Sequence, residues 1–322
     1  MTKRRFSILV ALFALWTCVA LGGTAQEQIN PTTYDVTYGI TLDLKAGSVS
    51  RLMANLPVPE SNQYQKVVPG KRTAGGKRTY PETGETFVTV TFDLRGAPGK
   101  RTFSYEHRFE ITLFETRTDF DAISILPYDK SGELYRRYTS ARGEYVMPGH
   151  PRITQIIDQL GDGTDVVEFA RKAYDYVAKN FTYKNPLTGL HRLDDIFANG
   201  GGDCGNLSSI FISILRKKGI PARHVVGRKP NGDLHIFSEF YLEGHGWVPV
   251  DVTYRMSKPD VDYFGRIRAN DRMIVFSRDV YLTVPTTEQP KKVDLMQTYK
   301  FWWRGKSCRF KHRDSFTAKK VH

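Results

Sequence analysis

A cysteine, a histidine and an aspartate in the second half of the chain have the residue types and order needed for thiol chemistry. Cys204 follows the flexible stretch GGGD and stands where an apolar helix is expected to begin. The unpaired N–H groups and the dipole of a helix start favour an anion, so they stabilise a thiolate nucleophile. Such a nucleophile needs a general base, and the base needs an orienting group. His235 and Asp251, on two predicted neighbouring strands, are the candidates for these roles.

The two strands must present His235 and Asp251 on the same face of a sheet. Side chains alternate along a strand, so in LHIFSEFYL His235 shares one face with every second residue after it. The turn EGHG then leads into WVPVDVT, which carries Asp251. A tight connection with an even number of residues would put the two side chains on opposite faces. We therefore predict an odd-length connection, or a β-bulge near Pro249.

Each of these residues also has an ordinary structural explanation. After removal of a leader, Cys204 and Cys308 are the two remaining cysteines, and a disulfide between them would suit an oxidising compartment. His235 could be a hydrogen-bonded core histidine. Asp251 could serve a turn or a salt bridge. The residues alone leave these alternatives open.

The other polar residues indicate no second site. We expect His224 and His245 to be structural or exposed, and Glu239 to pair with Arg223. The sequence contains no CxxC, HExxH or EF-hand spacing, no phosphate-binding loop and no dinucleotide fingerprint. We therefore predict neither a metal nor a cofactor.

The elements around the site predict an α+β fold. Residues 34–116 alternate apolar with polar side chains between turn-forming stretches, which predicts a small antiparallel domain of the sandwich type. Helices are expected in PRITQIIDQL, in TDVVEFARKAYDYVAKNF with Thr164 as its cap, in LHRLDDIFANG, and after Cys204. Strands return after Ile220. We divide the chain into a β-sandwich-like domain (26–145), a core (146–290) and a basic C-terminal strand or tail (291–322).

The N-terminus predicts export. Three basic residues precede the apolar run FSILVALFALWTCVAL, and small residues follow, which indicates a signal peptide cleaved near Ala25. A secreted or periplasmic protein is expected, held at a membrane only if the leader stays uncleaved. Cleavage changes the net charge from +13 to about +10. In an exported protein this excess suits anionic envelope polymers rather than nucleic acid, although a solvated face on the C-terminal strand would also explain it.

The region from Cys204 to Asp251 resembles the transglutaminase-like superfamily of papain-type thiol enzymes. The stretch GGDCGNLSSIFISILRKKGIPARHVVG fits the family's glycine-preceded cysteine and its R-x-x-G-I-P-A-R ending. The stretch HIFSEFYLEGHGWVPVDVT fits the strand with His and Glu and the Gly-Trp-x-Pro-x-Asp turn that follows it. The resemblance covers residues 164–280 and implies helices packed on an antiparallel sheet. It does not extend to the N-terminal β domain.

The resemblance implies a role for each residue of the motif. Cys204 would be the nucleophile, His235 the general base and acid, and Asp251 the carboxylate that orients the imidazole. The backbone N–H of Cys204 would donate to the oxyanion. The family often takes its second donor from an upstream tryptophan; this chain has none between the leader and Trp247, so Tyr183 or Asn185 is expected instead.

These observations predict an exported enzyme that forms a thioester at Cys204 from an amide of a protein or peptide substrate. Entry of water would make it a peptidase or amidase, and entry of a lysine amine would make it a transglutaminase. Hydrolysis is the preferred interpretation because an exported enzyme meets abundant water and dilute amines. A non-catalytic envelope scaffold on the same fold is the alternative from another class.

Overall fold

The computed structural model describes residues 26–80, 82–92, 94, 99, 101–161, 163, 165–184 and 189–321. The predicted leader and two residues of interest, Thr164 and Asn185, lie outside this part of the chain. The described residues combine helices with mainly antiparallel sheets, which confirms the α+β prediction. No helix within these ranges has both the length and the apolar character needed to cross a membrane.

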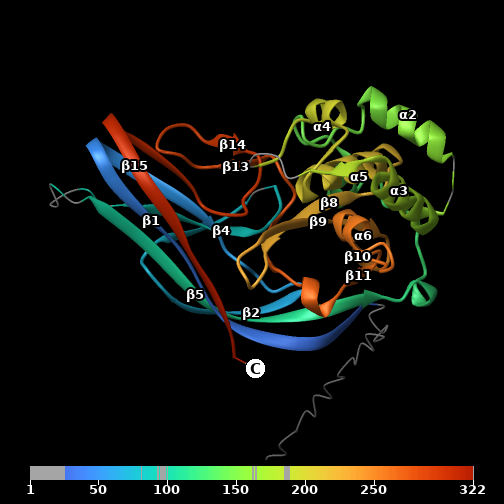
Figure 1. The fold of residues 1–322 in the computed structure, drawn as a ribbon, viewed down its shortest axis with the longest axis horizontal. Helices are drawn as coiled ribbons and strands as arrows, with labels where there is room; N and C mark the ends of the chain where they lie inside the picture. Colours follow the sequence, from blue (N-terminus) through green and yellow to red (C-terminus); the bar gives the residue numbers. More distant parts are fainter. Residues whose placement is uncertain are drawn as a thin grey trace, which may run out of the picture.

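The larger sheet draws its strands from both ends of the chain (Figure 1). Its members are β1 (Gln26–Pro57), β2 (Gln65–Arg72), β3 (Gly76–Thr79), β4 (Thr86–Thr91), β5 (Thr102–Thr118), β11 (Arg266–Ile267) and β15 (Lys300–Lys320). β1 pairs with β4 and β5 on one side and with β15 on the other. The register of β1 and β15 runs from Tyr34 opposite Lys320 to Asn55 opposite Lys300. The basic C-terminal segment is therefore a strand built into the N-terminal sheet.

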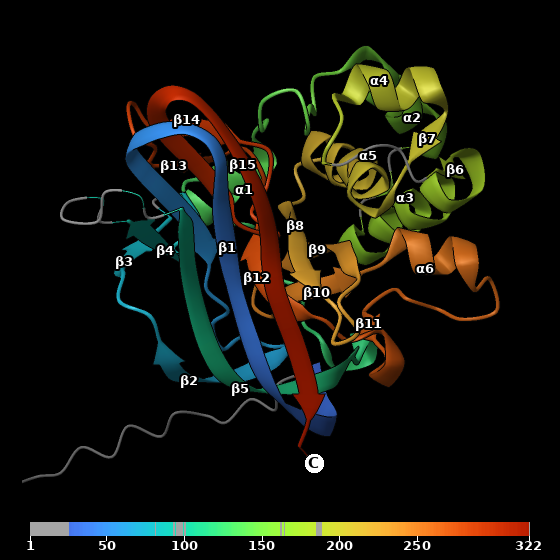
Figure 2. The same cartoon turned by 60° about the vertical axis from the view of Figure 1, so that its left-hand side comes forward.

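β1 and β15 fold back on themselves together. Their register shifts between residues 44 and 51, and two residues at the bend, Gly47 and Ser307, have φ angles of 79° and 48°. The centroids of the Phe301 and Phe310 rings are therefore only 5.8 Å apart, although the two residues are nine positions apart in sequence. Figure 2 shows both strands arching over at one end of the sheet. The two arms of β1 contribute to one apolar core, which includes Tyr38, Leu42, Leu52 and Leu56.

A second sheet and the helices form the core of the molecule. The sheet has the antiparallel order β10 (Gly246–Val250), β9 (Leu234–Leu242), β8 (Ala222–Arg228), β12 (Ile274–Arg278). The described helices are α1 (Glu133–Thr139), α2 (Pro151–Leu160), α3 (Val166–Asn180), α4 (Leu193–Asn199), α5 (Cys204–Lys217) and α6 (Val252–Ser257), with 3-10 turns η1 (Phe120–Ala122) and η2 (Ala269–Asp271). Short strands complete the structure: β6 (Thr182–Tyr183), β7 (Gly201–Gly202), β13 (Leu282–Val284) and β14 (Lys291–Val293). Phe276 of β12 packs on Tyr38, which joins this core to the larger sheet.

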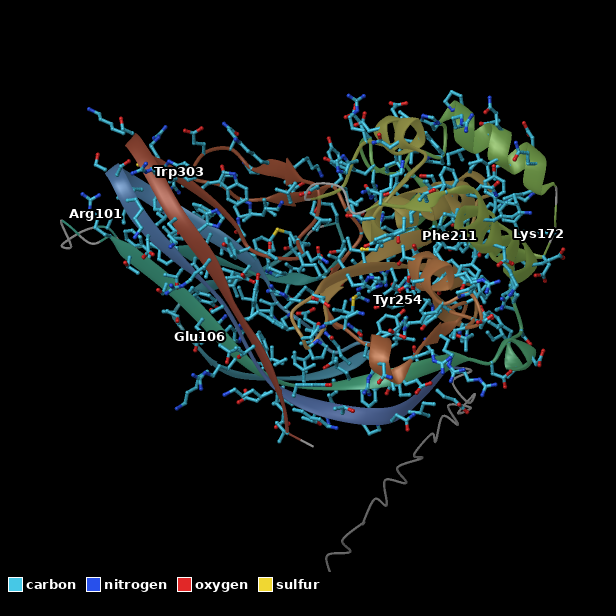
Figure 3. The ribbon with its side chains drawn as sticks, in the orientation of Figure 1. Arg101, Glu106, Lys172, Phe211, Tyr254 and Trp303 are labelled. Atoms are coloured by element: carbon cyan, nitrogen blue, oxygen red, sulfur yellow. The ribbon has the colours of Figure 1, made fainter. Side chains whose placement is uncertain are left out.

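α5 is the central helix. It packs against β8 and β9 on one side and against α2, α3 and α6 on others, so its residues from Gly205 to Arg216 are all buried. Figure 3 places Phe211 of this helix deep among the other helices. The predicted helices in PRITQIIDQL and LHRLDDIFANG are present as α2 and α4. The predicted cap of α3 was one residue early: Asp165, rather than Thr164, accepts the hydrogen bond from the backbone N–H of Glu168 at 2.7 Å.

Candidate active site

The glycines before Cys204 allow the chain to pass close to a neighbouring strand. Gly201 and Gly202 form β7, which pairs in parallel with Thr182 and Tyr183 of β6. A Cβ on Gly201 would lie 2.0 Å from the backbone oxygen of Thr182, and its φ of 149° disfavours other residues. A Cβ on Gly202 would lie 2.5 Å from a side-chain atom of α5. The glycines thus place Tyr183 beside the start of α5.

Asp203 caps α5 and so fixes the position of Cys204 at its first turn. The Asp203 carboxylate accepts hydrogen bonds from the backbone N–H and the side-chain amide of Asn206, at 3.1 Å and 2.8 Å. Burial raises the pKa of Asp203, against the opposing effect of these bonds. The cap therefore satisfies a backbone donor of the helix.

The connection between β9 and β10 brings His235 and Asp251 to one face. β9 and β10 pair in unbroken register from Leu242 opposite Gly246 to Ser238 opposite Val250, so residues 243–245 make a three-residue connection. The odd-length connection that the sequence predicts is confirmed. Nε2 of His235 lies 2.6 Å from Oδ2 of Asp251, and both side chains are buried.

Asp251 orients the imidazole and also begins a helix. Its second oxygen, Oδ1, accepts hydrogen bonds from the hydroxyl of Thr253 at 2.8 Å and from the backbone N–H of Tyr254 at 3.0 Å, which caps α6. The sequence left open a turn or a salt bridge as structural roles for Asp251; in the structure it caps α6 and pairs with His235. Because α6 holds Oδ1, the carboxylate has one orientation and directs Oδ2 at His235.

The electrostatics of the pair favour an imidazolium next to a carboxylate. Burial alone would lower the pKa of His235, but the charge of Asp251 and the hydrogen bonds to Asp251 and Cys204 raise it to about 10. Burial would conversely raise the pKa of Asp251, and His235 together with the capping hydrogen bonds keeps it below its usual value. His235 is therefore protonated at neutral pH when its partners are charged. Since its Nε2 faces Asp251, Nδ1 is the nitrogen left for the thiol.

Two residues that sequence reasoning missed hold His235 in place. The ring of Tyr254 stacks on the imidazole with centroids 4.6 Å apart and an interplanar angle of 21°. The side-chain amide of Gln297 donates to the backbone oxygens of His235 and Gly227 at 3.0 Å and 2.8 Å. The contact of Tyr254 could have been predicted from its position three residues after Asp251, because the first turn of a capped helix lies next to the capping residue. Nothing in the sequence around Gln297 indicates its contact.

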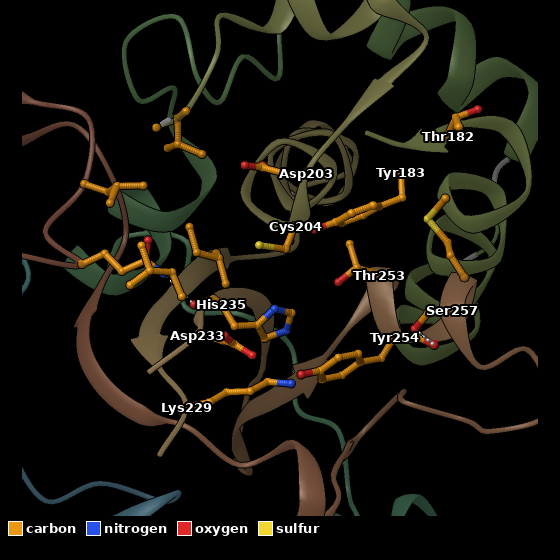
Figure 4. A pocket seen from close by; sticks show the side chains of 17 residues that line it. Thr182, Tyr183, Asp203, Cys204, Lys229, Asp233, His235, Thr253, Tyr254 and Ser257 are labelled. Carbon is orange, nitrogen blue, oxygen red and sulfur yellow. Dashed lines mark hydrogen bonds between the residues drawn. The ribbon is translucent and has the colours of Figure 1, made fainter. Parts of the chain in front are cut away.

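A pocket of about 920 Å³ lies over these residues. Figure 4 shows Cys204, His235, Tyr183 and Tyr254 around it. Tyr183 is 49% exposed, and burial of part of its ring together with the nearby Cys204 and Asp203 raises its pKa, so its hydroxyl remains a donor at neutral pH. The other predicted oxyanion donor, Asn185, lies outside the described residues.

The remaining predicted residues are structural. Glu239 pairs with Arg223 through Oε1 and Nε at 2.5 Å, as the sequence predicts, and also accepts the hydroxyl of Tyr64 at 2.7 Å. His224 is fully buried, where desolvation lowers its pKa to about 4, and His245 lies in the connection after β9. The described residues include no group of three or more His, Cys, Asp or Glu side chains arranged to hold a metal ion.

Both described cysteines are free, so they do not form the disulfide that the sequence left open. Cys204 faces the pocket, whereas Cys308 lies in β15, where its Sγ donates to the backbone oxygen of Ser48 at 3.1 Å. Cys204 begins helix α5 and Cys308 lies in a strand of the larger sheet, and the two thiols pack against different apolar clusters. The thiol of Cys204 is therefore available for chemistry.

A thiol at the start of a buried helix, with a carboxylate-bound histidine on an antiparallel sheet, defines a papain-type thiol site. Comparison with known proteins agrees with this class: residues 154–252 match the family model of the transglutaminase-like superfamily. A protein-glutamine gamma-glutamyltransferase of Pseudomonas aeruginosa is 28% identical over 134 residues. The match covers 36% of this chain but only 20% of that protein.

Two further relatives extend the comparison. An uncharacterized protein of Haemophilus influenzae is 28% identical over 121 residues, which are 29% of this chain and 33% of that protein. The chain therefore spans a third or less of each of these two curated relatives. The crystal structure of a candidate cysteine protease from Cytophaga hutchinsonii superposes with a TM-score of 0.60 at 14% identity. It covers 90% of this chain and 92% of its own, so the shared fold includes the N-terminal sheet.

Proposed function

We propose that the protein is a thiol enzyme that cleaves an amide bond of a protein or peptide through a thioester at Cys204. The observation that carries the proposal is the 2.6 Å contact of His235 with Asp251, beside a free thiol at the capped start of α5. This arrangement matches the requirement for a nucleophile, a base and an orienting group. Its catalytic roles are Cys204 as nucleophile, His235 as base and acid, and Asp251 as the orienting carboxylate.

The reaction takes place in two halves. The thiolate of Cys204 attacks the carbonyl carbon, and the resulting oxyanion accepts hydrogen bonds from the backbone N–H of Cys204 and the hydroxyl of Tyr183. The C–N bond then breaks as His235 gives its proton to the departing amine, which leaves a thioester and a neutral imidazole. Water attacks the thioester carbonyl while His235 takes up its proton. The C–S bond breaks, the acid leaves, and the thiolate–imidazolium pair returns.

Transamidation is the second candidate, favoured by the match to the Pseudomonas transferase. In that reaction a lysine amine replaces water as the group that attacks the thioester. Hydrolysis is our first choice because we also propose that the protein is exported, on the evidence of the basic and apolar stretch in residues 1–25, and water is abundant outside the cell.

The test is alkylation of both cysteines by iodoacetamide between pH 5 and 9, mapped by mass spectrometry. Cys308 provides an internal reference, because it is free and similarly half-buried but has no histidine partner. We expect Cys204 to react at least about tenfold faster than Cys308 at pH 6, where an ordinary thiol is almost fully protonated. Replacing His235 with Asn should abolish this advantage, and the matched change His245→Asn should leave it intact.

Substrate assays then separate the reactions. Peptide libraries incubated with and without a fluorescent primary amine report hydrolysis as new carboxyl termini and transamidation as amine incorporation. A protein whose Cys204 reacts no faster than Cys308 is a scaffold rather than an enzyme, and this result would refute the proposal. Dominant amine incorporation would replace hydrolysis with transamidation.

A further inference from the structure

The C-terminal strand carries an excess of positive charge that the rest of the described surface does not neutralise. Between residues 304 and 320 it has a single acidic residue, Asp314, which pairs with Arg228. The strand has seven basic residues over the same stretch: Arg304, Lys306, Arg309, Lys311, Arg313, Lys319 and Lys320. Of these, Arg304 forms an ion pair within the described part of the chain, with Glu288 at 3.5 Å. The other six have no described carboxylate within ion-pair distance.

Three of these cations form a row on the outward face of β15. Arg309, Lys311 and Arg313 are exposed, whereas Cys308 and Phe310 between and beside them pack toward the core of the larger sheet. Alternate residues of a strand are about 7 Å apart, so the row extends over about 13 Å. Figure 2 shows β15 at the front of the molecule, running beside β1.

The carboxylate of Asp43 lies near this row of cations. Asp43 of β1 stands opposite Lys311, accepts the hydroxyl of Thr102 at 2.8 Å and lies 3.8 Å from Lys45. Its pKa is lowered, first by the Thr102 hydrogen bond and then by the surrounding cations. The single carboxylate of Asp43 thus interacts with Thr102 and with several cations at once, and it leaves the row of three cations with a net positive charge.

An exposed indole and a free backbone edge accompany the cations. Trp303 is 43% exposed; it stacks on Phe301 at 5.5 Å and packs at a tilt against Phe310 at 5.3 Å between ring centroids, so it lies on the Phe310 side of β15, away from the row of cations. Figure 3 places Trp303 at the end of the sheet remote from the helices. Among the described strands, β1 alone pairs with β15, so the other edge of β15 presents unpaired N–H and C=O groups.

We propose that the free edge of β15, with Arg309, Lys311 and Arg313 on one face of the strand and Trp303 on the other, binds an acidic polysaccharide. The cations match repeated carboxylates, and the indole offers an apolar face to sugar rings. The free carbonyls of the edge need hydrogen-bond donors, which sugar hydroxyls supply and DNA phosphates do not. This combination favours a hydroxyl-rich polyanion over a nucleic acid or a membrane surface. Binding would hold the enzyme on a polymer while the separate pocket acts on its substrate.

The test uses the protein from residue 26 to its end and fluorescent polygalacturonate, followed by anisotropy at 50 and 200 mM salt. The variant R309Q/K311Q/R313Q should bind at least about tenfold more weakly, because three exposed charge contacts are lost. The matched variant K66Q/K71Q/R78Q removes three exposed cations from β2 and β3, and should change affinity less than twofold. Trp303→Ala should weaken binding separately. The wild-type affinity should fall at the higher salt concentration.

Neutral dextran, oligo(dT) and anionic vesicles serve as comparison ligands. The proposal predicts no binding of dextran and weaker binding of the other two. Tighter binding of oligo(dT) or vesicles through the same residues would overturn the assignment to polysaccharide. Absence of polygalacturonate binding would also overturn it, and self-association of the triple variant would then show that the cations protect the strand edge. Thermal unfolding and the alkylation rate of Cys204 report that each variant is folded.

Discussion

Replacing Asp251 with Asn should move the proton of His235. The substitution keeps an oxygen for the backbone N–H of Tyr254, so α6 remains capped, but it removes the charge that stabilises the imidazolium. Without this charge, the main remaining influence on the pKa of His235 is burial, which lowers the pKa of an imidazole. We expect the pKa of His235 to fall from about 10 toward its ordinary value of 6.5. The corresponding change Asp233→Asn, in an exposed carboxylate of the same pocket, should leave it near 10.

The size of the effect follows from linkage. A pKa raised from 6.5 to about 10 corresponds to about 5 kcal/mol of preference for the folded, protonated form. Because the folded value is the higher one, this stability is fully present below pH 6.5 and is lost as the pH rises toward 10. The wild-type free energy of unfolding should therefore fall by up to about 5 kcal/mol more across this interval than that of Asp251→Asn.

Two measurements check this reasoning. Side-chain nitrogen NMR of histidine between pH 5 and 10 follows His235 directly, and urea unfolding at pH 6.5 and 9.5 gives the stability difference. A wild-type His235 that titrates near 6.5 would refute it. So would an Asp251→Asn variant whose histidine titrates as in the wild type, since Asp251 would then not be the source of the shift.

Three further changes probe the supports of the site. Gly201→Ala should lower the free energy of unfolding by about 1–3 kcal/mol, because the new Cβ would lie 2.0 Å from a backbone oxygen. Gly149→Ala is the control: nothing lies within 4 Å of its Cβ position, so the free energy of unfolding should change little. Urea unfolding measures both variants. Asp279→Asn leaves three arginines without their buried partner and should cost about 3–5 kcal/mol. Because the pKa of Asp279 is held at about 2, the wild type should lose about 2.5 kcal/mol of stability as the pH falls from about 4 to 2. Tyr254→Leu should slow alkylation of Cys204 at pH 6, because it removes the ring that stacks on the imidazole of His235. Tyr254→Phe retains a ring and should leave the alkylation rate unchanged. Equal rates for both variants would show that the stacking has no positioning role.

The sequence sufficed for the parts of the site that depend on local rules. The start of α5 at Cys204 follows from the stretch GGGD and the apolar helix that comes after it. The shared face of His235 and Asp251 follows from the alternation of strand residues, once an odd-length connection is assumed. These predictions succeeded because each depends on neighbours within a few residues.

Contacts between distant segments were beyond the same reasoning. Gln297 reaches the backbone of His235 only because the chain after β14 crosses the core sheet, and no periodicity around Gln297 encodes that path. The pairing of β15 with β1 was equally hidden, since an amphipathic strand does not specify its partner. A bend shared by both strands further obscured the pattern, because the register shifts there interrupt the alternation.

The union of the first and last strands sets an order of events during synthesis. β1 leaves the ribosome first, yet one of its edges has no partner until residues 300–320 have been made. Pairings across so great a sequence separation form slowly, because closing a long loop costs entropy before any contact repays it. A shortened chain that lacks β15 would expose the inner side chains of β1 to solvent. The larger sheet can therefore close only in a product that extends through β15.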